Sequence, residues 1–169
     1  MAAALVLTGA DALQARELIL RPERVIALTC PTDARDVRTL VYFELPEGLR
    51  EVDNAFLVFR GEVEGADFGM VEVFPVTRDW KSAGTVTWES PWDSVGGDYS
   101  GRVARSSVTL KRNQGDKDIK LNVTLIVKAW LEGVAPNNGI VILPSRADLG
   151  NAPVQYSLPA RDVVLRIVY

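Results

Sequence analysis

The sequence predicts an all-β fold, a two-sheet antiparallel β-sandwich with one short helix around residues 123–132. Apolar and polar residues alternate with a period of two in short runs, and Gly, Pro, Asn or Asp interrupts these runs. Helical periodicity is rare. A chain of 169 residues fits one domain, because it can bury roughly 70% of its unfolded surface around one core. We therefore expect residues 1–169 to form a single sandwich domain.

Ten segments have the length and alternation of strands, which is enough for two packed sheets. They are Glu17 to Leu20, Arg24 to Leu28, Arg38 to Glu44, Asn54 to Glu62, Gly69 to Pro75, Ser106 to Lys111, Ile119 to Asn122, Gly139 to Leu143, Val154 to Ser157 and Asp162 to Val168.

One segment, Val123 to Glu132, has helical spacing instead, and Gly133 ends it. Asn122 or Thr124 can supply an N-cap oxygen. The expected helix would cover one open end or edge of the sandwich. Its apolar face is expected to comprise Leu125, Ala129, Trp130 and Leu131.

The segment from Trp80 to Arg105 is rich in Gly, Ser and Asp and holds three of the four tryptophans. It predicts an ordered loop region, with a short return into a strand from Thr85 to Trp88. Loops on a rigid scaffold commonly carry binding residues, so any ligand site is expected in this segment.

Composition excludes several function classes. The formal charge is −3 with scattered Lys and Arg, which argues against a nucleic-acid partner. The chain has no His and therefore lacks the usual general base and commonest metal ligand. Cys30 lies in an apolar run and is interpreted as a buried structural thiol. The candidate carboxylate groups occupy polar, turn-like surroundings, so no enzyme activity is expected: Glu62, Glu64 and Asp67, and Asp116 and Asp118.

The first ten residues are apolar but too short to span a bilayer, so no transmembrane segment is expected. Two interpretations stay open. Met1 to Ala10 is either a strand or the remnant of a signal sequence, with Ala10-Asp11-Ala12 as its cleavage site. As a strand, residues 1–12 could be exchanged with a neighbouring copy. The candidate assembly residues are Ala4, Leu5, Val6 and Leu7.

Several motifs together are similar to one known family. Val76 to Trp80 forms a V-T-x-x-W turn, T-V-T-W follows at Thr85 to Trp88, and a P-W…G-G-D loop follows at Pro91 to Asp98. A V-T…W…G…N-x-G pattern then runs from Val123 to Gly139. In this combination the chain resembles the DNRLRE domain family, which is related to alginate-binding carbohydrate modules.

The resemblance covers nearly the whole chain. Arg38 to Pro46, Asn54 to Arg60 and Val163 to Tyr169 resemble the early and closing strands of the family. It implies a jelly-roll-like sandwich and a secreted, non-catalytic module of polysaccharide-active or cell-surface proteins. We therefore expect an extracellular or cell-surface location.

The ligand candidates lie in the tryptophan-rich loop. Trp92, between Pro91 and Asp93, is expected to be exposed and to stack on a sugar ring. Asp98 and Tyr99 are candidates for binding hydroxyls or for helping to coordinate Ca²⁺, although no cofactor is established by the sequence. Trp80 is a further candidate, with core packing as the alternative. Trp88 and Trp130 are assigned to the core, and Gly96-Gly97 to a tight turn.

Two functions are consistent with these features. The first is a carbohydrate-binding or cell-surface recognition module whose partner is a polysaccharide. The second is a structural subunit of a filament, surface layer or virion, whose partners are copies of itself joined by N-terminal strand addition. A basic cluster around the turn from Asn113 to Asp118 could attract an anionic polymer, with an ordinary charged hairpin as the alternative: Lys111, Arg112, Lys117 and Lys120.

Overall fold

The computed structural model describes residues 15–113, 117–145, 155–157 and 162–169, with side chains for all of these except 155–157. The expected assembly strand within residues 1–12 and the carboxylate of Asp116 lie outside the described residues. No helix in the described ranges is long and apolar enough to cross a membrane.

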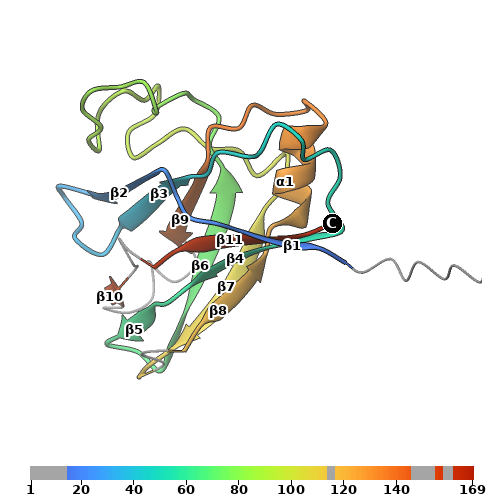
Figure 1. Ribbon diagram of the computed structural model, residues 1–169. Coiled ribbons are helices and arrows are strands. Elements are labelled where there is room, and N and C mark those ends of the chain that lie inside the picture. The colour runs from blue at the N-terminus through green and yellow to red at the C-terminus, as the bar shows by residue number, and fades with distance from the viewer. Residues whose placement is uncertain (1–14, 114–116, 146–154, 158–161) are drawn as a thin grey trace, which may run out of the picture.

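Two antiparallel sheets form the body of the molecule (Figure 1). One sheet has the strand order β1-β11-β4-β8 and the other β2-β3-β9-β6-β7, while β5 and β10 form a separate two-stranded ribbon. The bounds in the first sheet are β1 Glu17–Leu20, β11 Val164–Val168, β4 Asn54–Phe59 and β8 Ile119–Asn122. In the second sheet and the ribbon they are β2 Arg24–Thr29, β3 Val37–Tyr42, β9 Ile140–Pro144, β6 Phe68–Pro75, β7 Ser106–Lys111, β5 Glu62–Glu64 and β10 Gln155–Ser157.

This arrangement confirms the predicted all-β sandwich. The predicted strand from Asn54 to Glu62 is two strands, β4 and β5, separated by Arg60 and Gly61. The strand expected from Thr85 to Trp88 is wrong, because this segment is irregular and the Thr87 N–H bonds to the Ser90 carbonyl in a turn at 2.8 Å.

The main core fills the space between the two sheets. Leu57 and Phe59 of β4 face it from the four-stranded sheet, and Ile140 and Ile142 of β9 face it from the five-stranded sheet, all fully buried. Alternate residues of each strand supply these side chains, as the period-two pattern predicts. Burial of this apolar surface is the main stabilising contribution to the sandwich.

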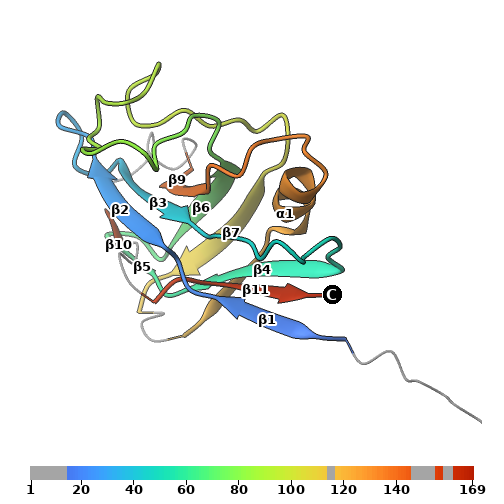
Figure 2. The ribbon, with the colours of Figure 1, turned by 45° about the horizontal axis from the view of Figure 1, so that its top comes forward.

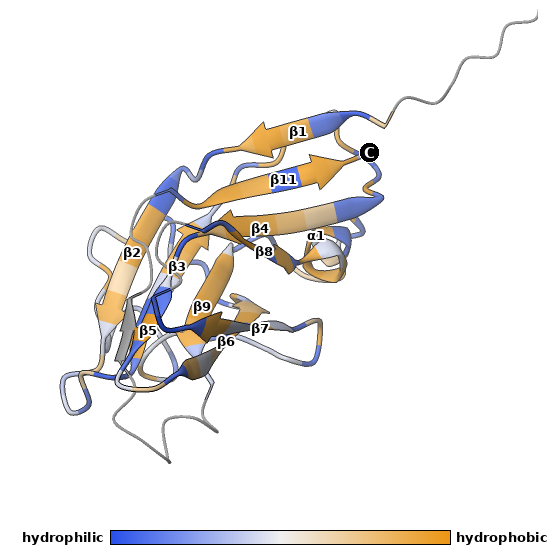
Figure 3. Cartoon of the chain, turned by 90° about the horizontal axis from the view of Figure 1, so that it is seen from below, coloured by the Kyte–Doolittle hydropathy of each residue, from blue (hydrophilic) through white to orange (hydrophobic). Residues whose placement is uncertain are grey.

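A second apolar cluster lies on the opposite face of the five-stranded sheet. There, Val141 and Leu143 of β9 pack beside Leu40 of β3, together with three tryptophans from the loop between β6 and β7. The strand β9 is therefore covered on both faces. This explains why its sequence is apolar along most of its length, without alternation (Figure 3).

The helix α1, Thr124–Leu131, closes one end of the main core by inserting Ile126, Val127 and Trp130. The inward position expected for Leu125 is wrong, because that side chain is 68% exposed. The N-cap residue is Val123, which makes no side-chain cap.

The two residues expected to cap the helix bond differently. The side chain of Asn122 accepts the Thr124 N–H at 3.0 Å, so it satisfies one donor at the helix start. The Thr124 hydroxyl instead accepts the Ala55 N–H of β4 at 2.9 Å, and this bond ties the helix to the four-stranded sheet.

Candidate functional site

The long loop from Val76 to Arg105 folds over the outer face of the five-stranded sheet, above β2 and β3 in Figures 1 and 2. Trp80 is fully buried and its indole N–H donates to the Asn138 carbonyl at 2.7 Å. Trp88 is 9% exposed and Trp130 of α1 is 7% exposed. Both values agree with the core roles predicted for these residues. A buried indole contributes a large apolar area. The N–H of Trp80 is hydrogen-bonded, whereas that of Trp130 has no partner among the described residues.

The exposure predicted for Trp92 is wrong. The side chain is 8% exposed, and its indole N–H donates to the Thr87 carbonyl at 2.8 Å. The ring completes the second apolar cluster, so its faces lie against protein rather than solvent. Sequence position between Pro91 and Asp93 did not indicate this, because the packing partners come from distant strands.

Arg24 on β2 fixes one part of the loop. Its guanidinium donates to the carbonyls of Trp80, Lys81 and Ala83 at 3.2, 2.6 and 3.1 Å. It also lies 5.3 Å from the centroid of the Trp80 ring. A planar guanidinium with several N–H donors is suited to forming hydrogen bonds with several loop carbonyls at once.

Arg38 on β3 fixes the other part and is 6% exposed. Its guanidinium pairs in a bidentate manner with Asp36 at 3.0 and 2.8 Å and donates to the Gly96 carbonyl at 2.6 Å. It also lies 4.4 Å from the centroid of the Trp88 ring and 5.8 Å from that of Tyr99. Both distances are within the range of cation–π attraction.

A surface pocket of about 780 Å³ opens beside this arginine. Its charged lining residues come from β3 and from two parts of the loop: Arg38, Arg78, Asp79, Asp93 and Asp98. The remaining lining residues are Thr77, Ser94, Val95, Gly97 and Tyr99. Polar groups converge on this concave site beside one aromatic ring, and its lining is more polar than that of most small-ligand sites, which are largely apolar.

Asp98 organises the wall of the pocket. Its two carboxylate oxygens accept the N–H groups of Asp93 and Ser94, both at 2.8 Å. Its own carbonyl accepts the Thr77 N–H at 2.9 Å. These bonds join the two ends of the loop around the pocket, and charge-assisted bonds to backbone N–H groups are the stronger kind.

Gly96 permits the close approach of the loop to β3. Its φ is +84°, and a Cβ there would lie 2.6 Å from Nη1 of Arg38 and 2.8 Å from Cζ2 of Trp88. The turn predicted at Gly96-Gly97 is thus confirmed. The structure adds a steric reason, because a side chain at this position would displace Arg38.

Two ion pairs contribute lining residues to the pocket, and two further lining carboxylates lie outside these pairs. Arg38 pairs with Asp36, and Arg78 pairs with Asp93 at the exposed rim. Asp79 accepts the Lys81 N–H at 2.9 Å and the Ser82 hydroxyl at 3.4 Å, and Asp98 accepts backbone N–H groups. Neither Asp79 nor Asp98 has a cationic side-chain partner among the described residues.

The structure therefore brings together two of the four predicted ligand residues, Asp98 and Tyr99, at one pocket. Trp80 and Trp92 lie buried behind it. Sequence reasoning missed Arg38, Arg78 and Asp79. The sequence held a signal for Arg38, because it lies in a predicted buried strand. An arginine is rarely fully buried without a partner, so its position indicated a specific contact.

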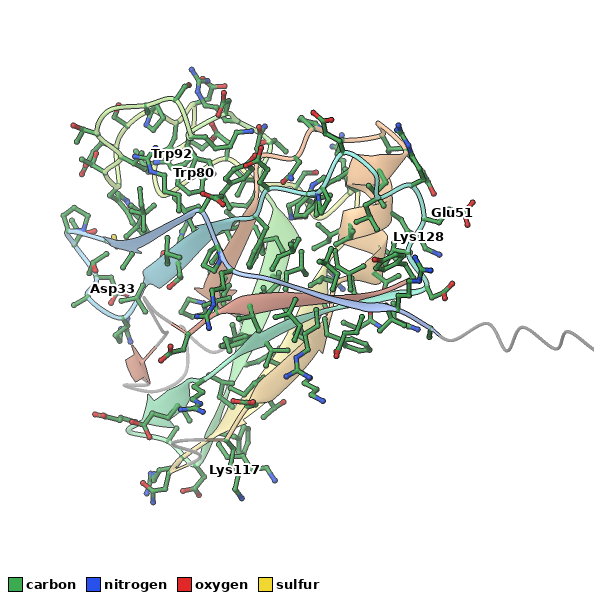
Figure 4. All side chains as sticks on the ribbon, in the orientation of Figure 1. Asp33, Glu51, Trp80, Trp92, Lys117 and Lys128 are labelled. Atoms are coloured by element: carbon green, nitrogen blue, oxygen red, sulfur yellow. The ribbon has the colours of Figure 1, made fainter. Side chains whose placement is uncertain are left out.

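A smaller pocket of about 230 Å³ lies between the 50–53 segment and the end of α1, where Glu51 and Lys128 lie near one another in Figure 4. Long charged side chains form much of its lining, which also includes Asp53 and Glu132. The two pockets thus differ, because the main pocket has a buried, hydrogen-bonded charged residue, Arg38, in its lining.

Other predicted chemical groups lie apart from the main pocket. Glu64 and Asp67 are exposed and do not line it. The described residues hold no cluster of three or more His, Cys, Asp or Glu side chains suited to a metal ion. Cys30 is half-buried rather than buried, which corrects that expectation. A hydrogen bond with the Thr32 side chain is the main cause that lowers the pKa of the Cys30 thiol.

Comparison with known proteins adds no relative. The chain matches no protein-family model, and none of the curated proteins is a significant match. By its structure the protein is a two-sheet β-sandwich, with a pocket beside a buried tryptophan cluster on one face.

Proposed function

We propose that this chain is a non-catalytic recognition module of the DNRLRE type that binds a carbohydrate, at the cell surface or outside the cell. The observation that carries the proposal is the pocket of about 780 Å³ lined by Arg38, Asp98 and Tyr99. Carboxylates and guanidinium groups suit the many hydroxyls of a sugar, because the carboxylates accept and the guanidinium groups donate hydrogen bonds. The ring of Tyr99 is packed against Phe74 and lies near Arg38, and its hydroxyl can both donate to and accept from a sugar hydroxyl.

Preorganisation supports the same proposal. Tyr99 packs against Phe74 with 5.0 Å between ring centroids, and Arg38 is held by Asp36 and Gly96. A site whose side chains are already ordered loses little conformational entropy on binding. The bound ligand would thus meet a formed pocket rather than a loop that must fold around it.

The test is binding of the purified chain to an array of polysaccharides and oligosaccharides, with and without Ca²⁺. We expect retention by at least one glycan and about a tenfold loss of affinity in Arg78→Ala, which removes a lining residue at the rim. The matched control is Arg112→Ala. Arg112 is also an exposed arginine paired with one aspartate, Asp67, but it lies outside the pocket.

Two outcomes would count against the proposal. Failure of every glycan, in both Ca²⁺ conditions, would reject carbohydrate binding. An equal loss in Arg112→Ala would move the site to the basic residues near Lys117, which lies at the end of the molecule away from Trp80 and Trp92 (Figure 4). These residues follow β7 and precede β8, which belong to different sheets, so the charged hairpin expected there is wrong.

A second candidate function is self-assembly into a filament, surface layer or virion by addition of the N-terminal segment as a strand. One observation favours it: β1 is the edge strand of its sheet, and within the described part of the chain it pairs only with β11. An edge strand presents unpaired backbone groups that a strand from a neighbouring copy can satisfy.

This candidate is tested by light scattering of the full chain beside a chain without residues 1–12. Because β1 begins at Glu17, the deletion leaves the described sheet intact. Assembly predicts large species from the full chain and monomers from the deletion, with equal far-UV circular dichroism for the monomer. Monomers from both chains would reject it.

A further inference from the structure

We infer that the main pocket selects a saccharide carrying a positive charge, such as an amino sugar, over a neutral or uronate saccharide. This inference rests on the proposed function and adds the charge class of the ligand. It has two bases. The arginines of the pocket are paired with carboxylates, whereas two of its carboxylates have no cationic partner among the described residues. In addition, the buried Arg38 has N–H groups that no described residue accepts.

Both arginines of the pocket already have anionic partners. Asp36 holds Arg38 in a bidentate pair in which the two side chains are 18% and 7% exposed, and Asp93 pairs with Arg78. An anionic ligand could reach Arg38 only through the N–H groups that Asp36 and Gly96 leave unused, and at either arginine it would lie beside a carboxylate that repels it. A bidentate pair of this kind is already geometrically matched, so displacement gains little.

The carboxylates of Asp79 and Asp98 are not neutralised in the same way. Their described partners are the N–H groups of the backbone and one serine hydroxyl. Counting Asp36, the groups named here comprise four carboxylates and two guanidinium groups, which leaves two negative charges. A cationic ligand is attracted to such a site, and a uronate is repelled from it.

Arg38 supplies the second observation. A guanidinium has five N–H donors, and described residues accept three from Arg38, two at Asp36 and one at Gly96. One N–H on each terminal nitrogen remains without a partner among the described residues, although the residue is only 6% exposed and lines the pocket. Those donors suit a sugar hydroxyl, which accepts without needing a negative charge.

Different groups of the pocket would recognise different parts of the ligand. The Arg38 donors and the Tyr99 hydroxyl would bind the hydroxyls of the sugar, which all saccharides share. The carboxylates of Asp79 and Asp98 would bind an ammonium group and so select among saccharides by charge. Charge-assisted hydrogen bonds to carboxylates are roughly twice as strong as neutral ones.

The experiment uses three β-1,4-linked hexasaccharides that share a backbone and differ in charge: glucosamine, glucose and glucuronic acid. Their affinities for the full chain are measured by calorimetry at pH 6, where a large part of the glucosamine amines is protonated. We expect the glucosamine hexamer to bind about tenfold more tightly than the glucose hexamer, and the glucuronate hexamer to bind most weakly.

The site variant is Asp79→Asn, which keeps the shape of the side chain and removes its charge. It should reduce the preference for the glucosamine hexamer at least threefold, with little change for the glucose hexamer. Asp53→Asn is the matched control, because Asp53 is also an exposed aspartate outside the ion pairs of the described residues but lies at the smaller pocket. Unfolding curves of both variants establish that they are folded.

Each outcome decides. Equal or tighter binding of the glucose or glucuronate hexamer overturns the inference while leaving carbohydrate binding intact. Binding of none of the hexamers also overturns the inference, and if the array is negative as well, the proposed function itself is overturned. Equal binding of hexalysine would reduce the effect to general cation attraction and overturn the assignment to an amino sugar.

Discussion

At the scale of single residues, two Asp–Arg pairs close together in the chain show how burial changes the role of an ion pair. Asp33–Arg35 lies at the surface, with side chains 36% and 37% exposed. Asp36–Arg38 is largely buried and also holds Gly96 and the Trp88 ring. The same residue types at the same spacing therefore form a surface pair and a central structural contact.

Replacing Arg38 with Met should destabilise the fold by about 3 kcal/mol, because Asp36 and the Gly96 carbonyl lose a buried charged donor. Urea unfolding measures the change. The control is Arg35→Met, for which a much smaller change is expected, since exposed pairs contribute little. Similar losses in the two variants would contradict the role assigned to Arg38.

The pH dependence of Asp33 follows from its partner. Hydrogen bonds from the Arg35 side chain, and then from its backbone N–H, lower the pKa of Asp33 from 3.8 to about 2. A lowered carboxyl pKa in the folded state stabilises the protein above the unfolded pKa, and this contribution is lost as the pH falls from 3.8 through about 2.

Carboxyl NMR of Asp33 should thus titrate near 2, and Arg35→Met should move the midpoint up toward 3.8. Arg35→Lys keeps the charge but loses the guanidinium fork, so its midpoint should fall between these values. A midpoint that does not respond to Arg35→Met would show that other groups set this pKa.

At the scale of elements, the connection between α1 and β9 fixes how the loop meets the sheet. Gly139, with φ +82°, directly precedes β9, and its carbonyl accepts the Val76 N–H at 3.0 Å. Asn137 and Asn138 beside it hold the Phe43 and Thr77 carbonyls at 2.9 and 3.1 Å. This short segment therefore joins β3, β9 and the start of the tryptophan loop.

Gly139→Ala should destabilise the protein by about 3 kcal/mol or more, because a Cβ there meets the Val41 carbonyl oxygen and lies 3.2 Å from the Tyr42 Cα. Gly133→Ala is the matched control. Its φ is +70°, but a Cβ would have nothing within 4 Å, so only the conformational cost of about 1 kcal/mol applies. Equal effects in thermal or urea unfolding would contradict the steric argument.

At the scale of the whole molecule, one central sheet lies between two apolar clusters. The main core lies on its inner face and the tryptophan cluster on its outer face, with β9 contributing to both. Arg24 and Arg38 bond the loop to β2 and β3, so the outer cluster is attached to the sheet by charged groups as well as by packing.

The two clusters should consequently unfold together. Three of the four tryptophans lie in the outer cluster, so near-UV circular dichroism reports mainly on the loop and far-UV circular dichroism on the sheets. Coincident urea transitions are expected. Loss of the tryptophan signal at a lower urea concentration would show that the loop opens independently of the sandwich.

The sequence by itself determined most of the strands, because period-two alternation records which face of a strand is buried. The limits of β1, β7 and β8 are as predicted, and the helix differs by one residue at each end. Local composition also indicated Asp98 and Tyr99, which line the main pocket; their role in binding stays a prediction. Strand limits, helix limits and loop composition depend mainly on residues that are close together in the sequence.

Only the tertiary structure decided which residues meet at the pocket. Arg38 and Gly96 are 58 positions apart, and Arg24 is as far from the loop that it holds. The burial of Trp92 and the exposure of Leu125 likewise depend on what distant segments cover. Sequence patterns report the faces of a single element, whereas a pocket is formed by contacts between elements, and those contacts depend on how the sheets and the loop pack.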